Sequence, residues 1–117
     1  MAWIFKPKRN YNNQSNRNKR QEIYNTTLWR KMRLAKLREQ PICQICEMEG
    51  KTKLSEHCHH LDSFMDSDNP VERDAKAFDS NNLICLCQYH HNQIHNGDLK
   101  GCKTINEIKK RLELLNQ

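Results

Sequence analysis

The sequence predicts a small α+β domain that a bound metal ion holds together. The chain has 117 residues, of which 36% are hydrophobic, so it can build only one small core. Six cysteines and six histidines are available as metal ligands. Short apolar segments alternate with segments of helical periodicity. A domain this short and polar often needs a staple such as a metal ion.

Basic residues are concentrated near the N-terminal end. Residues 1–40 contain 11 Lys or Arg and two acidic residues, whereas residues 41–117 contain nine basic and 12 acidic residues. Residues 6–21 are rich in Asn and basic side chains and nearly lack aliphatic ones, which predicts disorder. We therefore expect a basic, disordered arm over 1–24 and a folded domain over 25–117. Such an arm suggests a polyanionic partner, although a solvated tail has the same composition.

A helix is expected to follow the arm. Thr26 or Thr27 can cap its start, and Pro41 prevents it from continuing past Gln40. One face carries an apolar stripe of Leu28, Met32 and Ala35, to which Leu34 and Leu37 can add. The other face carries the candidate nucleic-acid-binding residues, which are Arg30, Lys31, Arg33, Lys36 and Arg38. The basic face can equally be a solvated surface.

The rest of the chain predicts two short strands and two helices. The strands are expected near residues 56–61 and at 83–86, with a long acidic loop over 62–81 between them. A helix is expected from about 88 to 95, where Asn96-Gly97 ends it. A capping box at Thr104-Ile-Asn-Glu107 predicts a final helix that ends near Leu115.

Two pairs of potential ligands have the spacing of zinc knuckles. Cys43-x2-Cys46 and Cys87-x2-His90 each place two ligands on a tight turn, and zinc prefers four thiolate or imidazole ligands. The alternative is that the cysteines are small buried residues without a metal. We expect a structural zinc ion on these four residues.

A second cluster contains only histidines. His91 and His95 are four residues apart, so they lie on the same face of a helix, and His59-His60 supplies two further imidazoles. An i, i+4 histidine pair alone is often just a polar helix surface. With the added pair, three imidazoles could hold a metal ion while the fourth performs chemistry.

Together these residues resemble the HNH endonucleases, a family with a ββα-metal fold. His60, Asn82 and His91 would be the three residues that name the family. The segment 79–91 is similar to the family pattern D-x-x-N-L-x-x-L-C-x-x-C-H, and the upstream Cys-x2-Cys pair is similar to the zinc-containing branch common in phages and prophages. The resemblance covers residues 41–95 and implies a ββα-metal core at about 55–96, stapled by the structural zinc and flanked by helices.

The sequence departs from the family pattern at two positions. His90 stands where the zinc-containing branch usually has Cys, which zinc tolerates. His59 stands where many members have Asp, and His95 extends the motif. A ligand set of imidazoles without a carboxylate leaves the ion open among Mg²⁺, Mn²⁺, Ni²⁺ and Zn²⁺.

The resemblance implies a role for each of these residues. His60 would be the general base, Asn82 would brace the long loop, and one divalent ion would be held by His59, His91 and His95. Adjacent residues of a strand point to opposite faces, so His59 and His60 can act together only at a strand end. His57 has the same parity as His59 and stays an alternative ligand.

The implied function is metal-dependent hydrolysis of DNA phosphodiester bonds, either by nicking or by double-strand cleavage. The resemblance also implies a phage or prophage origin, with a terminase or packaging protein as a candidate partner. A non-catalytic zinc module that binds nucleic acid is the main alternative. An adaptor in which zinc only stabilises the fold is a third.

The sequence predicts a cytoplasmic protein without a membrane partner. No apolar run approaches the roughly 18 residues that a membrane span requires, and the first residues lack the long apolar stretch of a secretory signal. Cysteine-rich and histidine-rich chains in a reducing compartment bind metal more often than they form disulfides. We therefore expect the bacterial or host-cell cytoplasm.

Overall fold

The computed structural model describes residues 17–116 of the chain. A helical run at 17–24 comes first. The elements that follow are α2 (Thr27–Glu39), α3 (Gln44–Met48), β1 (His57–His60), the 3₁₀ turn η2 (Phe64–Asp66), α4 (Pro70–Ala77), the 3₁₀ turn η3 (Ser80–Asn82), β2 (Leu83–Leu86), α5 (Gln88–Asn96) and α6 (Ile105–Leu115).

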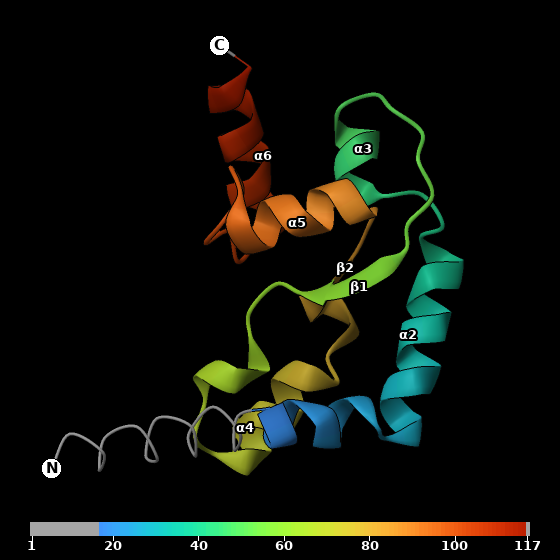
Figure 1. Ribbon diagram of the computed structural model, residues 1–117, viewed down its shortest axis with the longest axis vertical. Helices are drawn as coiled ribbons and strands as arrows, with labels where there is room; N and C mark the ends of the chain where they lie inside the picture. Colours follow the sequence, from blue (N-terminus) through green and yellow to red (C-terminus); the bar gives the residue numbers. More distant parts are fainter. Residues whose placement is uncertain (1–16, 117) are drawn as a thin grey trace, which may run out of the picture.

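The two strands form an antiparallel hairpin at the centre of the molecule, and α2 and α5 pack on it (Figure 1). His57 pairs with Leu86, and His60 pairs with Leu83. Side chains therefore alternate between two faces of the sheet. The strand–strand–helix unit of β1, β2 and α5 is the ββα core that the family resemblance implies, and the small α+β fold is confirmed.

Local signals set the helix boundaries. The Thr26 side chain accepts a hydrogen bond from the backbone N–H of Trp29, which starts α2. The Thr104 side chain accepts from the N–H of Glu107, whose carboxylate in turn accepts from the N–H of Lys103. The expected Thr104 cap therefore starts α6, but the reciprocal bond of the predicted capping box goes to the N–H of Lys103 rather than to that of Thr104.

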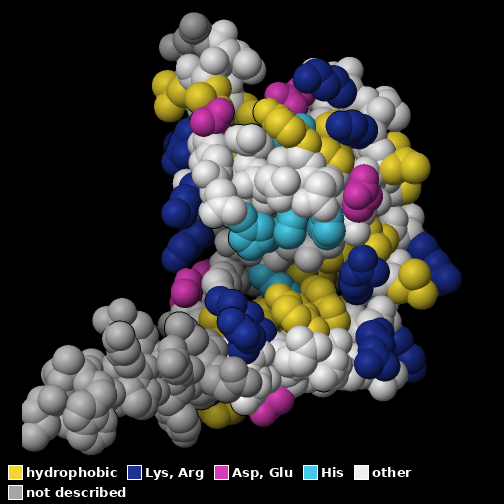
Figure 2. Space-filling view, in the orientation of Figure 1, with side chains coloured by type: hydrophobic (Ala, Val, Ile, Leu, Met, Phe, Trp, Pro, Cys, Tyr) yellow, Lys and Arg dark blue, Asp and Glu magenta, His cyan; other side chains and the backbone are white. Residues whose placement is uncertain are grey.

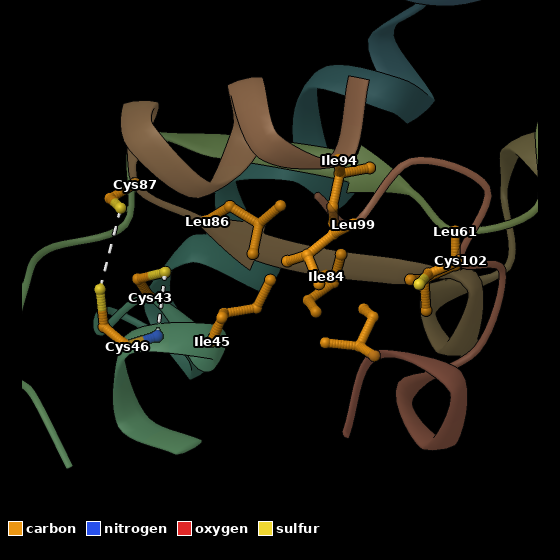
Figure 3. Close-up of a cluster of buried hydrophobic side chains, with 11 residues drawn as sticks. Cys43, Ile45, Cys46, Leu61, Ile84, Leu86, Cys87, Ile94, Leu99 and Cys102 are labelled. Carbon is orange, nitrogen blue, oxygen red and sulfur yellow. Dashed lines mark hydrogen bonds between the residues drawn. The ribbon is translucent and has the colours of Figure 1, made fainter. Parts of the chain in front are cut away.

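A single main core joins the sheet to α3, α5 and α6. Ile84 and Leu86 of β2 lie at its centre and are fully buried (Figure 3). Cys43, Cys46 and Cys87 gather at one end of this core, and Leu61 and Cys102 lie at the other (Figure 3). A smaller cluster holds Ile23, Phe64 and Ala77.

Three expectations need correction. The segment 17–24 is helical rather than disordered, because Ile23 buries its side chain in the smaller cluster. The part of the predicted arm before residue 17 lies outside the described residues. The predicted 62–81 loop contains α4, which Pro70 opens at the first helical position and Asn69 caps by accepting from the N–H of Val71.

The third correction concerns the buried face of α2. The only buried residue of α2 is Trp29, whereas Leu28 of the predicted apolar stripe is 53% exposed. The helix is thus rotated relative to the predicted stripe, because the bulky indole fills the space beside the end of β1. Within residues 17–116, no helix is long and apolar enough to cross a membrane.

Candidate functional site

The structure brings the four predicted zinc ligands together. One ligand atom from each of Cys43, Cys46, Cys87 and His90 lies within 4.8 Å of the others, and all four residues are buried. The Nδ1 atom of His90 lies 3.5, 3.3 and 3.4 Å from the Sγ atoms of Cys43, Cys46 and Cys87, respectively. Cys43 and Cys87 occupy the N-cap positions of α3 and α5, so the starts of two helices hold the cluster.

The chemistry of this donor set fits zinc. Burial and the neighbouring thiols raise the pKa of Cys46 to about 12, because several thiolates cannot ionise side by side without a cation. Three thiolates and one imidazole around a common centre are a typical structural zinc site. The Nε2 atom of His90 points away from the thiols and lies 2.9 Å from Oε1 of Glu49.

Glu49 was missed by the sequence analysis. A carboxylate that accepts from the outer nitrogen of a ligand histidine fixes its tautomer and orients the ring toward the metal. Glu49 follows α3 and is not spaced like a ligand, so only the packing of α3 against the start of α5 reveals the contact.

The three histidines of the second cluster also lie together. His59, His91 and His95 each offer a nitrogen within 4.8 Å of the others. The Nε2 atoms of His91 and His95 are 3.1 Å apart, as one turn of α5 places them. His57 is not part of this group: its ring stacks on His91 with a centroid distance of 4.3 Å, and its Nε2 lies 2.7 Å from Oε1 of Gln88.

Burial keeps two histidines of this cluster, His59 and His91, neutral. Desolvation, with the neighbouring imidazoles as a second cause, lowers the pKa of His59 to about 4, and the same two causes lower the pKa of His91 to about 4. At neutral pH both rings therefore carry a lone pair. Neutral imidazoles converging at this distance can bind a divalent cation without first losing protons.

His60 lies on the opposite face of the sheet from His59. Its ring stacks on Trp29 at a centroid distance of 4.8 Å, meets Phe64 edge-on at 4.9 Å, and its Nε2 lies 2.9 Å from the carbonyl oxygen of Ala77. A carbonyl oxygen only accepts, so Nε2 must carry the proton and Nδ1 keeps its lone pair. Burial lowers the pKa of His60, which also favours the neutral ring.

Although they lie on opposite faces of the sheet, His59 and His60 line the same cavity. His59, His60, His91 and His95 all line a cavity of about 460 Å³. His60 is the last residue of β1, so the strand-end position that the sequence analysis required is present. Histidine side chains form a row across the middle of this face of the molecule, with basic side chains on both sides of it (Figure 2).

Asn82 fixes the backbone that follows β1. Its Oδ1 accepts a hydrogen bond from the N–H of Asp62 at 2.8 Å, and its Nδ2 donates to the carbonyl oxygens of Asp62 and Lys76 at 2.8 and 3.0 Å. The Asn82 carbonyl also accepts from the N–H of Leu61. One amide thus ties the end of β1 to α4, the element whose final residue contacts His60.

The basic residues that line the cavity differ from those predicted. Arg20, from the helical run 17–24, and Lys103, from the loop before α6, line the cavity. The five predicted basic residues of α2 do not line it, and most are exposed along the helix. Sequence reasoning missed Arg20 because its segment was expected to be disordered.

Comparison with known proteins gives one informative similarity. No protein-family model matches the chain, and no curated protein matches it. Among solved structures, the chain is similar to the HNH endonuclease of the deep-sea thermophilic bacteriophage GVE2, determined with a manganese ion. The TM-score is 0.59 at 26% sequence identity, over 72% of this chain and 86% of that one.

This similarity supports the resemblance of the chain to the HNH endonucleases. The chain combines a fold shared with a phage nuclease, a Cys/His cluster suited to zinc, and a histidine cluster that lines a cavity. The shared fold supports nuclease activity in general terms. The two clusters give the chain two places where a metal ion could bind.

Proposed function

We propose that this protein is a metal-dependent endonuclease that hydrolyses DNA phosphodiester bonds. The observation that carries the proposal is the shared cavity, which is lined both by a three-histidine cluster and by a histidine held as a neutral base. A phosphodiester needs an activated water and a stabilised anionic transition state. At the end of β1, the histidine on one face can activate the water, and the three-histidine cluster on the other face can hold the ion that stabilises the transition state.

His60 is the proposed general base. The Ala77 carbonyl holds the Nε2 proton in place, so Nδ1 is the atom that accepts a proton from water. The stacked Trp29 ring keeps the imidazole from rotating. Asn82 is a positioning residue, because it holds the loop and α4 around His60.

His59, His91 and His95 are the proposed ligands of one divalent ion, and Mg²⁺, Mn²⁺, Ni²⁺ and Zn²⁺ are the candidates. When bound, such an ion offsets charge on a phosphate oxygen and on the departing 3′ oxygen. The manganese in the similar phage structure supports Mn²⁺ as the first ion to test. Cys43, Cys46, Cys87 and His90 are the proposed ligands of a structural zinc.

Basic side chains supply the proposed DNA contacts. Arg20 and Lys103 line the cavity, which supports the proposal that they contact phosphates beside the scissile bond. Arg30, Lys31, Arg33, Lys36 and Arg38 of α2 are proposed to contact phosphates farther along the duplex. The similarity to a bacteriophage nuclease supports a phage or prophage origin, and a terminase partner stays a prediction of the family resemblance.

Plasmid nicking tests the proposal. Supercoiled plasmid is incubated with the zinc-loaded protein in EDTA and then with each candidate ion. We expect ion-dependent conversion to nicked or linear DNA, and we expect His60→Ala to slow it about 100-fold or more without changing the zinc content. Salt-sensitive DNA binding without cleavage under any ion would favour the non-catalytic zinc module instead.

A matched pair of variants tests the ligand assignment. His59→Ala should abolish cleavage and binding of the added ion, whereas His57→Ala should keep most of both, because His57 lies outside the ligand group. Loss of ion binding with His57→Ala alone would show that the ligand assignment is wrong.

A further inference from the structure

Two cysteines outside the proposed zinc cluster are neighbours on adjacent strands, on the same face of the central sheet. Cys58 of β1 and Cys85 of β2 are register partners, and their Sγ atoms lie 3.7 Å apart. Both thiols point toward α2, where they lie 3.7 and 3.5 Å from the carbonyl oxygens of Arg33 and Lys36, respectively. Neither sulfur belongs to a group of potential metal ligands among residues 17–116.

The backbone at this pair suits a disulfide. Leu61 and Asn82 form a hydrogen-bonded pair in the same register, since the N–H of Leu61 donates to the Asn82 carbonyl at 2.8 Å. Hydrogen-bonded and non-hydrogen-bonded pairs alternate, so Cys58 and Cys85 occupy a non-hydrogen-bonded position. Consistent with this, the N–H of Cys85 donates to Oε1 of Gln44 rather than to β1.

Such a position already has the separation that a disulfide requires. Cα atoms of non-hydrogen-bonded pairs are about 4.5 Å apart, within the range of about 4.4–6.8 Å found for disulfides. The two sulfurs must approach from 3.7 Å to about 2.05 Å, which side-chain rotation can largely supply. The strands need little movement.

The two thiols differ in exposure. Cys85 is completely buried, whereas Cys58 is partly exposed and lines the 460 Å³ cavity. A small oxidant therefore meets Cys58 first, and Cys85 lies behind it as the thiol that can complete the bond. This arrangement is typical of a reactive cysteine and its resolving partner.

We propose that Cys58 and Cys85 are a peroxide-sensitive dithiol that closes to an intrachain disulfide. The Cys58 thiolate attacks a peroxide oxygen and becomes a sulfenic acid as the first water leaves. The Cys85 sulfur then attacks the Cys58 sulfur, and the S–O bond breaks as the second water leaves. In sum, two thiols and H₂O₂ give one disulfide and two waters, and the sulfurs are oxidised while the peroxide is reduced. The dithiol does not depend on nuclease activity.

Mass spectrometry tests the proposal directly. The zinc-loaded full chain is treated with H₂O₂, its free thiols are alkylated under denaturing conditions with a chelator, and tryptic peptides are mapped. We expect the intact chain to lose two mass units on oxidation. After alkylation and digestion, we expect peptides 54–73 and 77–100 to be linked. Their fragment ions should place the bond at Cys85 and the alkyl group at Cys87. A first disulfide at Cys43, Cys46 or Cys87, or stable sulfinic acid at Cys58, would overturn the proposal.

Variants and a stability measurement provide the controls. Cys58→Ser should abolish the linked pair, Cys85→Ala should leave a sulfenic acid at Cys58 that dimedone traps, and Cys102→Ser should change nothing. The oxidised wild-type chain should unfold at a temperature roughly 5 °C or more above the reduced chain. A lower unfolding temperature would mean that the bond distorts the sheet, and would also contradict the proposal.

Discussion

The two candidate metal sites of this protein lie along α5 and differ in almost every physical respect. The Cys/His cluster at its start is buried and has four potential ligands plus the Glu49 carboxylate behind one of them. The histidine cluster toward its end is partly exposed, has three potential ligands and lines a cavity. A closed set of four ligands is typical of structural zinc, and an incomplete set that faces a cavity is typical of catalysis. One short helix can therefore contribute to a structural metal site near its start and to a catalytic metal site near its end.

The largest expected effect is loss of the fold when the closed cluster is broken. Cys46→Ala removes a buried residue that we propose as a zinc ligand between α3 and α5, and metal binding at such sites is largely folding free energy. We expect the variant, or the wild-type chain stripped by a strong chelator, to lose its cooperative unfolding transition in circular dichroism. A variant that unfolds as cooperatively as the wild type would refute a structural role for this cluster.

The second prediction is loss of activity without loss of fold when the open cluster is broken. His91→Ala should lower plasmid nicking about 100-fold or more, since it removes one of three proposed ligands. Its unfolding temperature should stay within a few degrees of the wild-type value. The contrast between the two clusters would fail if His91→Ala unfolded the chain as severely as Cys46→Ala.

The third prediction concerns Glu49. Glu49→Gln keeps the shape of the side chain but removes the charge that orients His90, so zinc affinity should fall about 10- to 100-fold. Competition with a colorimetric chelator measures the change. Glu47→Gln, on the exposed side of α3, is the matched control and should leave the affinity unchanged.

The fourth prediction is a pH dependence of the metal-free histidine cluster. The pKa values of His59 and His91 are about 4 in the folded chain, well below the ordinary histidine value of 6.5. The unfolded chain therefore binds more protons between about pH 6.5 and 4, so the free energy of unfolding should fall as the pH falls through this window. NMR titration of the ring protons should give midpoints below 5 for both residues, and midpoints near 6.5 would contradict the buried, neutral cluster.

The smallest expected effect separates the two sets of basic residues. Arg20→Gln beside the cavity should raise the KM for DNA and lower the rate several-fold, whereas Arg30→Gln on exposed α2 should weaken binding slightly. Steady-state nicking at two salt concentrations measures both. Equal effects would mean that proximity to the cavity does not distinguish these arginines.

The pairs within each candidate site were predictable from sequence because their geometry is local. Two cysteines on a tight turn, or two histidines one helical turn apart, lie together in any fold that contains those elements. How Cys43 and Cys46 meet Cys87 and His90, and how His59 meets His91 and His95, depends on the packing of distant segments, which the family resemblance implied. The strand at 83–86 and the capped helix α6 were also predictable from the sequence, because an apolar run and a helix cap are both short-range signals.

What the sequence analysis missed depends on contacts between distant segments. The helical run at 17–24 owes its order to Ile23, whose partners lie about 40 or more residues away. The contact of Trp29 with His60 and that of Glu49 with His90 likewise depend on how helices pack rather than on spacing. The helix α4 was missed because its few apolar residues form no clear stripe, and its Asn69-Pro70 start resembles a turn.

The most direct test of the account is to remove one ion and keep the other. The purified protein is dialysed against EDTA at a concentration that strips the open histidine cluster but leaves the buried cluster loaded. Its zinc content and its nicking rate are then measured before and after Mn²⁺ is added. We predict one zinc per chain throughout, no nicking after dialysis, and full recovery with Mn²⁺. Nicking that persists without an added ion, or that returns only when zinc re-enters the cysteine cluster, would contradict a structural zinc that is separate from the catalytic ion.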